Sequence, residues 1–168
     1  MTAQRQPRPT LKPGQRAEPA SKQRLRLWLR LLRTSRAIEG ELRERLRVGF
    51  DTTLPKFDVM AALDRRPAGM TMTELSRFLM VSNGNVTGII DRLAAEGIVM
   101  RRPHKEDRRA TFVHLTPKGA RQFAAMAKAH ETWVGEILAH ITVEEAQSII
   151  ALLGRSERQH RRLAAIEN

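Results

Sequence analysis

Residues 72–91 read MTELSRFLMVSNGNVTGIID, the pattern of two short helices that cross at a turn. The apolar positions fall where such a pair must bury side chains, and Ser76 is small at the point of closest approach. Met80 occupies the turn position where glycine is common, which indicates a wider turn. The positions expected to be buried are Leu75, Leu79, Val81, Val86 and Ile89. This stretch predicts a helix-turn-helix, with Thr71 and Glu74 as a capping box at its start.

The second helix of this motif has a capped start and a polar face. Ser82 stands at the N-cap position and Gly97 at the C-terminal stop. Such a helix fits the major groove of B-DNA, where asparagine pairs with adenine and serine or threonine discriminate less. The expected DNA contacts are Ser82, Asn83, Asn85 and Thr87. A capped surface helix without a partner is the alternative interpretation of the same residues.

Two short β-prone runs follow, at 98–102 and 111–115, with the polar segment PHKEDRRA between them. They predict a hairpin with a basic tip, a wing that reaches a minor groove or phosphates. The expected wing contacts are Lys105, Arg108 and Arg109. Asp107 is expected to pair with one of the arginines and hold the loop rigid. A solvated charged turn is the alternative.

Longer helical patterns flank this module. Residues 22–48 show helical apolar spacing beside an arginine face, and Gly49 marks the expected end of that helix. Pro55 opens a second helix, whose inward positions are Phe57, Val59, Met60 and Leu63. Thr116 and Thr142 start two more helices after the hairpin. The wide apolar faces of the long helices need a partner, which a second copy around a two-fold axis supplies.

We therefore expect a mainly α protein with a small β-hairpin wing, in which a winged helix-turn-helix is flanked by long dimerisation helices. The expected divisions are a disordered basic arm at 1–21, an N-terminal dimerisation and ligand helix at 22–54, the DNA-binding winged helix at 55–116 and C-terminal dimerisation helices at 117–168. A two-fold dimer predicts an inverted-repeat operator on double-stranded DNA.

The charge of the chain supports a polyanionic partner. Its 168 residues carry a net charge of +12, concentrated at 1–21 (+3), 22–47 (+6) and 98–121 (+5). Cysteine is absent, and the sequence has no HExxH, Gly-rich phosphate loop or clustered carboxylate pair, so we expect no enzyme, no metal and no cofactor. No apolar run approaches 18 residues and no secretory signal is present, which predicts a cytoplasmic protein without a membrane span.

Three runs resemble the MarR family, the multiple antibiotic resistance regulators: LPKFDVMAAL at 54–63, the segment 72–99, and DRRATFVHLTPKG at 107–119. A D-R-R wing followed by an L-T-P-x-G helix start is specific to this family among winged helices. The resemblance implies a homodimeric transcription factor, usually a repressor, that leaves DNA when a small anionic aromatic molecule binds. It also implies base or phosphate contacts for the four recognition-helix residues named above, and an orienting role for Asp107 beside Arg108 and Arg109.

A ligand pocket is expected between the first helix, the 55–66 helix and the fifth helix. Its apolar walls are expected to be Trp28, Phe57 and Met60, and its anion-binding residues Arg26, Arg30, Arg33 and Arg36. Residues 25–39 look most like regulators of aromatic-acid catabolism, including those that sense hydroxycinnamoyl-CoA thioesters, whose phosphates need several arginines. The alternatives are arginines that face solvent or DNA flanks, and core packing for Trp28 and Trp133.

Two other functions would explain the basic charge of the chain but not all of its motifs. A sequence-indifferent nucleic-acid-coating protein explains the charge, but it gives no reason for a capped helix that bears asparagines. Membrane attachment through the basic amphipathic helix at 22–47 is the third possibility.

Overall fold

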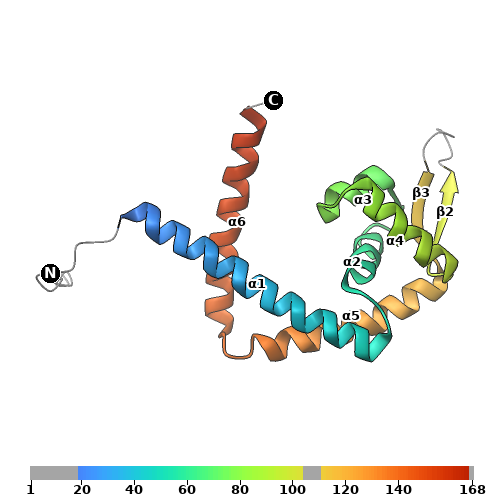
Figure 1. Ribbon diagram of the computed structural model, residues 1–168, viewed down its shortest axis with the longest axis horizontal. Helices are drawn as coiled ribbons and strands as arrows, with labels where there is room; N and C mark the ends of the chain where they lie inside the picture. Colours follow the sequence, from blue (N-terminus) through green and yellow to red (C-terminus); the bar gives the residue numbers. More distant parts are fainter. Residues whose placement is uncertain (1–18, 104–110, 167–168) are drawn as a thin grey trace, which may run out of the picture. The chain divides into compact units, whose positions relative to one another are not determined.

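The computed structural model describes residues 19–103 and 111–166, with side chains as far as Gln159. The chain divides into two compact units, Met1–Ala37 and Ile38–Asn168, and the boundary falls inside the first helix. The elements in chain order are α1 (Ala20–Phe50), α2 (Leu54–Asp64), β1 (Met70–Thr71), α3 (Met72–Leu79), α4 (Asn83–Ala95), β2 (Val99–Pro103), β3 (Thr111–Leu115), α5 (Pro117–Ile137) and α6 (Val143–Ile166) (Figure 1). The predicted class, mainly α with a small β-hairpin, is confirmed.

The described part of the first unit is the N-terminal portion of α1, and its apolar side chains are exposed. Trp28 has 58% of its surface accessible, and Leu25, Leu27 and Leu29 are exposed with it. Core packing of Trp28, the alternative to a ligand role, is therefore not seen within this unit. The expected disordered arm at 1–21 lies outside the described residues, apart from 19–21.

The starts of α5 and α6 follow the caps that the sequence predicts, whereas the cap of α2 was not predicted. Thr53 caps α2 by accepting the amide of Lys56, with a proline in the first turn. Thr116 caps α5 by accepting the amide of Gly119, and Thr142 caps α6. The expected end of α1 at Gly49 is wrong, because the helix continues to Phe50 and Asp51 takes the left-handed conformation at φ 47°. Aspartate tolerates that conformation because its short polar side chain bonds locally.

The sheet is antiparallel, with strand order β1-β3-β2. The hairpin pairs Val99 with Leu115 and Pro103 with Thr111, which confirms the two predicted strands. The two-residue strand β1, whose Met70 pairs with Val113, is missing from the sequence prediction. A strand this short leaves no alternating pattern from which to predict it.

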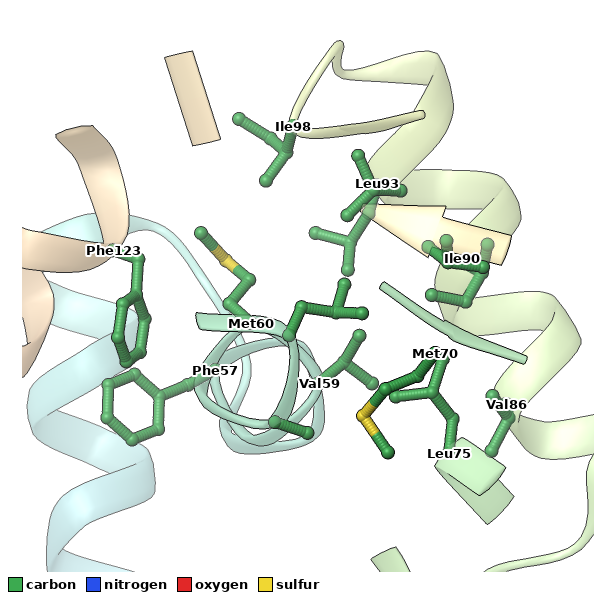
Figure 2. Packing of buried hydrophobic residues seen from close by; sticks show 14 of the residues in the cluster. Phe57, Val59, Met60, Met70, Leu75, Val86, Ile90, Leu93, Ile98 and Phe123 are labelled. Atoms are coloured by element: carbon green, nitrogen blue, oxygen red, sulfur yellow. The ribbon is translucent and has the colours of Figure 1, made fainter. Parts of the chain in front are cut away.

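The core lies where α2, α3, α4, the sheet and α5 meet. Figure 2 shows Phe57 of α2 beside Phe123 of α5, and their ring centroids are 5.6 Å apart. The predicted inward residues of α2 are all buried, and Leu75, Val86 and Ile90 bury the contact between α3 and α4. Val81, expected to be buried with them, is exposed. It lies in the turn before the N-cap of α4, outside the packed faces of both helices.

Candidate nucleic-acid interface

Helix α3 begins at a complete capping box. The Thr71 amide and hydroxyl donate to the Glu74 carboxylate at 2.8 and 2.9 Å, and the Glu74 amide donates to the Thr71 hydroxyl oxygen at 3.2 Å. These bonds from Thr71 favour the ionised form and lower the pKa of Glu74. The cap therefore fixes the first turn of α3.

The turn between α3 and α4 uses a left-handed methionine. Met80 has φ 54° and is 92% exposed, and the Val81 amide donates to the Ser76 carbonyl at 3.1 Å. Ser76 is buried, as its small size predicts, and its hydroxyl donates to the Thr73 carbonyl at 3.0 Å. Methionine thus takes the backbone conformation that glycine adopts most readily.

All four predicted contacts on α4 are exposed. The Ser82 hydroxyl oxygen accepts the Asn85 amide at 3.4 Å, so the helix starts where the sequence indicates. The Thr87 hydroxyl donates to the Asn83 carbonyl at 2.9 Å, which uses its single proton and leaves Thr87 as an acceptor toward solvent. Val86, Ile90 and Leu93 on the opposite face are fully buried and hold α4 in place.

The predicted contacts at the wing tip, Lys105, Arg108 and Arg109, lie outside the described residues, as does Asp107. The described part of the wing adds cations that the sequence analysis left out. Arg101 and Arg102 are exposed on β2, and Arg101 forms an ion pair with Asp91 of α4, with Nη2 and Oδ1 2.6 Å apart. That pair ties the wing to the recognition motif.

A basic cleft of about 740 Å³ lies between α4, the start of α2 and the last turns of α1. Gly84 and Gly88 of α4 line it, and open space surrounds both, because a Cβ at either position would meet no atom within 4 Å. The cations of this basic cleft are Arg43, Arg47, Lys56 and Arg92. Sequence analysis missed the cleft because its cations come from three separated elements, and only the charge excess at 22–47 pointed toward it.

The residues of the predicted ligand pocket fall into two groups. Trp28 and the predicted anion-binding residues Arg26, Arg30, Arg33 and Arg36 belong to the first unit, where all of them are exposed. Phe57 and Met60 belong to the core of the second unit. Phe57 lies between Phe123 and the His130 ring, whose centroid is 4.7 Å from that of Phe57. The pocket that would combine the two groups stays a prediction.

Burial beside Phe57 affects His130. It lowers the pKa of His130 below the ordinary value of 6.5. Within the described residues, no group of three histidine or carboxylate side chains is arranged to hold a metal ion, and no helix is long and apolar enough to cross a membrane.

A capped helix-turn-helix, an adjoining antiparallel hairpin and long helices before and after them define a winged-helix protein. Residues 52–111 match the MarR family. The transcriptional regulator PecS of Dickeya dadantii is 32% identical over 105 residues, which cover 61% of this chain and 63% of PecS. The regulator YkoM of Bacillus subtilis is 30% identical over 118 residues, which cover 70% of this chain and 75% of YkoM. The chain belongs to the MarR family.

Solved structures share this fold. A MarR family transcriptional regulator from Silicibacter pomeroyi has a TM-score of 0.71 at 31% identity, and the match covers 85% of this chain and 99% of that one. A mutant MarR from E. coli complexed with operator DNA has a TM-score of 0.71 at 24% identity, over 83% of this chain and 99% of that one. The chain spans 60 to 63% of the length of PecS and of two other curated relatives. The predicted family and fold are confirmed.

Proposed function

We propose that the protein is a sequence-specific DNA-binding transcriptional regulator that responds to a ligand. In this proposal it is a repressor, released from an inverted-repeat operator by an anionic aromatic compound or an aromatic acyl-CoA such as hydroxycinnamoyl-CoA. Residues 22–54 and 117–168 form the dimer, and residues 55–116 bind the DNA. Family membership supports the proposal, since PecS and YkoM are named as transcriptional regulators.

The observation that carries the proposal is the presentation of α4. Its buried face is fixed by Val86, Ile90 and Leu93, and its N-terminal half exposes asparagine, serine and threonine side chains. A short polar helix fixed in this way matches the shape of the major groove. Arg101 and Arg102 are exposed on β2, and we propose that they contact phosphates of the same duplex, although Arg101 also pairs with Asp91.

The dimer follows from unpartnered apolar surface. Helix α6 exposes a run of large aliphatic side chains: Val143, Ile149, Ile150, Leu152 and Leu153. Monomeric proteins rarely expose contiguous apolar patches beyond a few hundred Å², so a second copy is the expected cover. The half-sites of the operator are then expected about 34–36 Å apart, one turn of the duplex.

The basic cleft is the site proposed for the anionic effector. Lys56 already pairs with Glu96 and Arg47 with Glu44, so Arg43 and Arg92 are the cations proposed to bind its carboxylate or phosphate. Val81, Pro55 and Ile89 offer apolar contact to an aromatic ring. Because Asn85 and Ile89 of α4 line the same cleft, a ligand bound there touches the recognition helix directly. The predicted binding of CoA phosphates by the arginines of α1 around Trp28 is a separate proposal, which concerns the first unit alone.

DNA selection tests this function. The protein is incubated with a library of random duplexes, the enriched duplex is recovered, and its affinity is compared with that of a scrambled duplex by fluorescence anisotropy. We expect an inverted repeat to be enriched. Asn83→Ala is expected to lower affinity for that duplex about tenfold, the loss of a paired base contact. Equal affinity for the selected and the scrambled duplex would instead indicate a sequence-indifferent nucleic-acid-coating protein.

The response to ligand is tested with the selected duplex and a panel of aromatic acids and their CoA thioesters. A hundredfold release needs about 2.7 kcal/mol of differential binding between the two dimer conformations. Thermal stabilisation of the dimer identifies the ligand class, and the affinity for DNA is then measured at saturating ligand. An unchanged affinity for DNA at saturation would contradict the release mechanism.

A further inference from the structure

The turn that follows α4, residues 96–98, is held by the first turn of α5. Three consecutive carbonyls accept hydrogen bonds from it. The Glu96 carbonyl accepts from Lys118 Nζ at 2.8 Å, the Gly97 carbonyl from the Thr116 hydroxyl at 2.7 Å, and the Ile98 carbonyl from the Thr116 amide at 2.9 Å. Glu96 is the C-cap residue of α4 and its carbonyl has no partner within the helix, so Lys118 of α5 supplies one.

The Glu96 side chain connects the same turn to a third element. Its carboxylate lies 2.5 Å from Lys56 Nζ, at the start of α2. The Lys56 side chain is only 16% exposed, against 47% for Glu96. Water and salt therefore screen this pair less than a pair between two exposed side chains. The C-terminal end of α4 is thus bonded to α2 on one side and to α5 on the other.

Close packing against α5 also confines this end of the helix. A Cβ at Gly119 would lie 2.1 Å from the Ile98 carbonyl oxygen, so only glycine permits the observed approach of α5. Gly97 turns the chain out of α4 with φ +70°, a conformation that glycine adopts without strain. The hydrogen bonds from α5 and the Glu96–Lys56 ion pair therefore add to the packing that already restrains the backbone of residues 96–98.

The position of this turn decides how the other end of α4 points. Asn83 begins the helix and Glu96 follows it, about 20 Å apart at 1.5 Å per residue. A tilt of about 5° at Glu96 would displace the Asn83 end by roughly 1.7 Å over that length, which is more than a paired base contact tolerates. The polar face of the N-terminal half is exposed, so the direction of α4 is set by the 96–98 turn together with the buried Val86, Ile90 and Leu93.

We propose that Glu96 is a positioning residue for base recognition, which fixes the direction of α4 through Lys56 and through the α5 contact at its own carbonyl. This role rests on the proposed DNA-binding function, because it matters to affinity only if α4 contacts bases. It predicts that loss of the carboxylate weakens binding to the selected duplex, although removal of a negative charge by itself strengthens attraction to DNA.

The test compares Glu96→Gln with a matched variant, Glu131→Gln, which removes an exposed carboxylate from α5. We expect Glu96→Gln to lower affinity for the selected duplex about three- to tenfold, the range of coupling within one ion pair. Affinity for the scrambled duplex is expected to stay equal or rise in both variants. The reversed pair, Glu96→Lys with Lys56→Glu, is expected to recover most of the loss. Equal or higher affinity of Glu96→Gln for the selected duplex, or no recovery, would overturn the role.

Hydrogen exchange in the absence of DNA gives a second measurement. The Gly97 and Ile98 amides donate to the Ala94 and Leu93 carbonyls at 2.9 and 2.8 Å, so they report on the end of α4. We expect Glu96→Gln to speed their exchange several-fold while Glu131→Gln leaves it unchanged. If Glu96→Gln speeds exchange of these amides but the wild-type protein selects no duplex, the proposed DNA-binding function is wrong, while the structural role of the Glu96–Lys56 pair is retained. If the wild type selects a duplex and Glu96→Gln changes neither measurement, the positioning role is wrong.

Discussion

At Gly119 the absence of one methyl group lets two backbones meet. The Thr116 cap, the bend after α4 and the start of α5 all depend on the space beside the Ile98 carbonyl. Sequence analysis recognised the LTPxG run as a family signature and a helix start. It gave no reason for the glycine, because the atom that excludes a side chain belongs to a residue 21 positions earlier.

Gly119→Ala is therefore expected to destabilise the protein by about 1–3 kcal/mol, the usual cost of overpacking in a closely packed region. Gly135→Ala in the same helix is the matched control, since a Cβ there meets no atom within 4 Å. Alanine at 135 is expected to be neutral or to stabilise by up to ~1 kcal/mol through helix propensity. Urea unfolding of both variants at one protein concentration measures the difference, and similar values for the two would contradict it.

Among the elements, those with local signals were predictable from the sequence. Thr71, Ser82 and Thr116 are caps that act within one turn, so the starts of α3, α4 and α5 follow from their immediate neighbours. Strand β1 and the basic cleft depend on residues far apart in the chain. Met70 becomes a strand residue only because Val113 lies beside it, and Arg43 joins the cleft only through the packing of α1.

The contact between α2 and α5 is expected to make stability depend on pH. The His130 ring stacks on Phe57, and burial lowers its pKa in the folded state below 6.5. Between that lowered pKa and 6.5, the unfolded chain binds a proton at this site that the folded chain does not. The contribution to stability is therefore complete above pH 6.5 and is lost as the pH falls through 6.5 toward the folded pKa.

Unfolding free energies at pH 7 and pH 5 measure this effect. His130→Phe keeps a ring against Phe57 but cannot titrate, so its loss of stability between the two pH values is expected to be smaller than that of the wild type. An NMR titration of the assigned His130 ring checks the pKa directly. Identical pH profiles for wild type and variant would show that the contact does not discriminate between the protonation states.

At the scale of the whole molecule, the chain alone leaves large apolar side chains of α1 and α6 exposed. Ile150 on α6 is 69% exposed, and Trp28 on α1 is exposed as well. Dimer formation was inferred from the sequence by the same reasoning about apolar faces. The sequence does not determine which faces meet, because an apolar face packs as well against its own chain as against another.

Ile150→Glu is expected to convert the proposed dimer to single 19.1 kDa chains, because it places a charge in the apolar surface of α6. Ala151→Glu is the control and is expected to remain dimeric, because Ala151 is exposed on the same helix and its neighbours one turn away are Gln147, Ser148, Gly154 and Arg155. Sedimentation equilibrium measures the mass, and affinity for the selected inverted repeat is expected to fall with it. A wild type that sediments as a single chain would remove the basis for an inverted repeat.

Strand β1 has a consequence for a protein that searches DNA. Thr71 pairs with Phe112 in the sheet and also caps α3, so one residue serves both the hairpin and the helix pair. In the proposed regulator, the distance between the DNA contacts of the hairpin and those of α4 is therefore fixed in the free protein. If the proposed function holds, a duplex that has the correct bases at a different spacing is expected to bind more weakly.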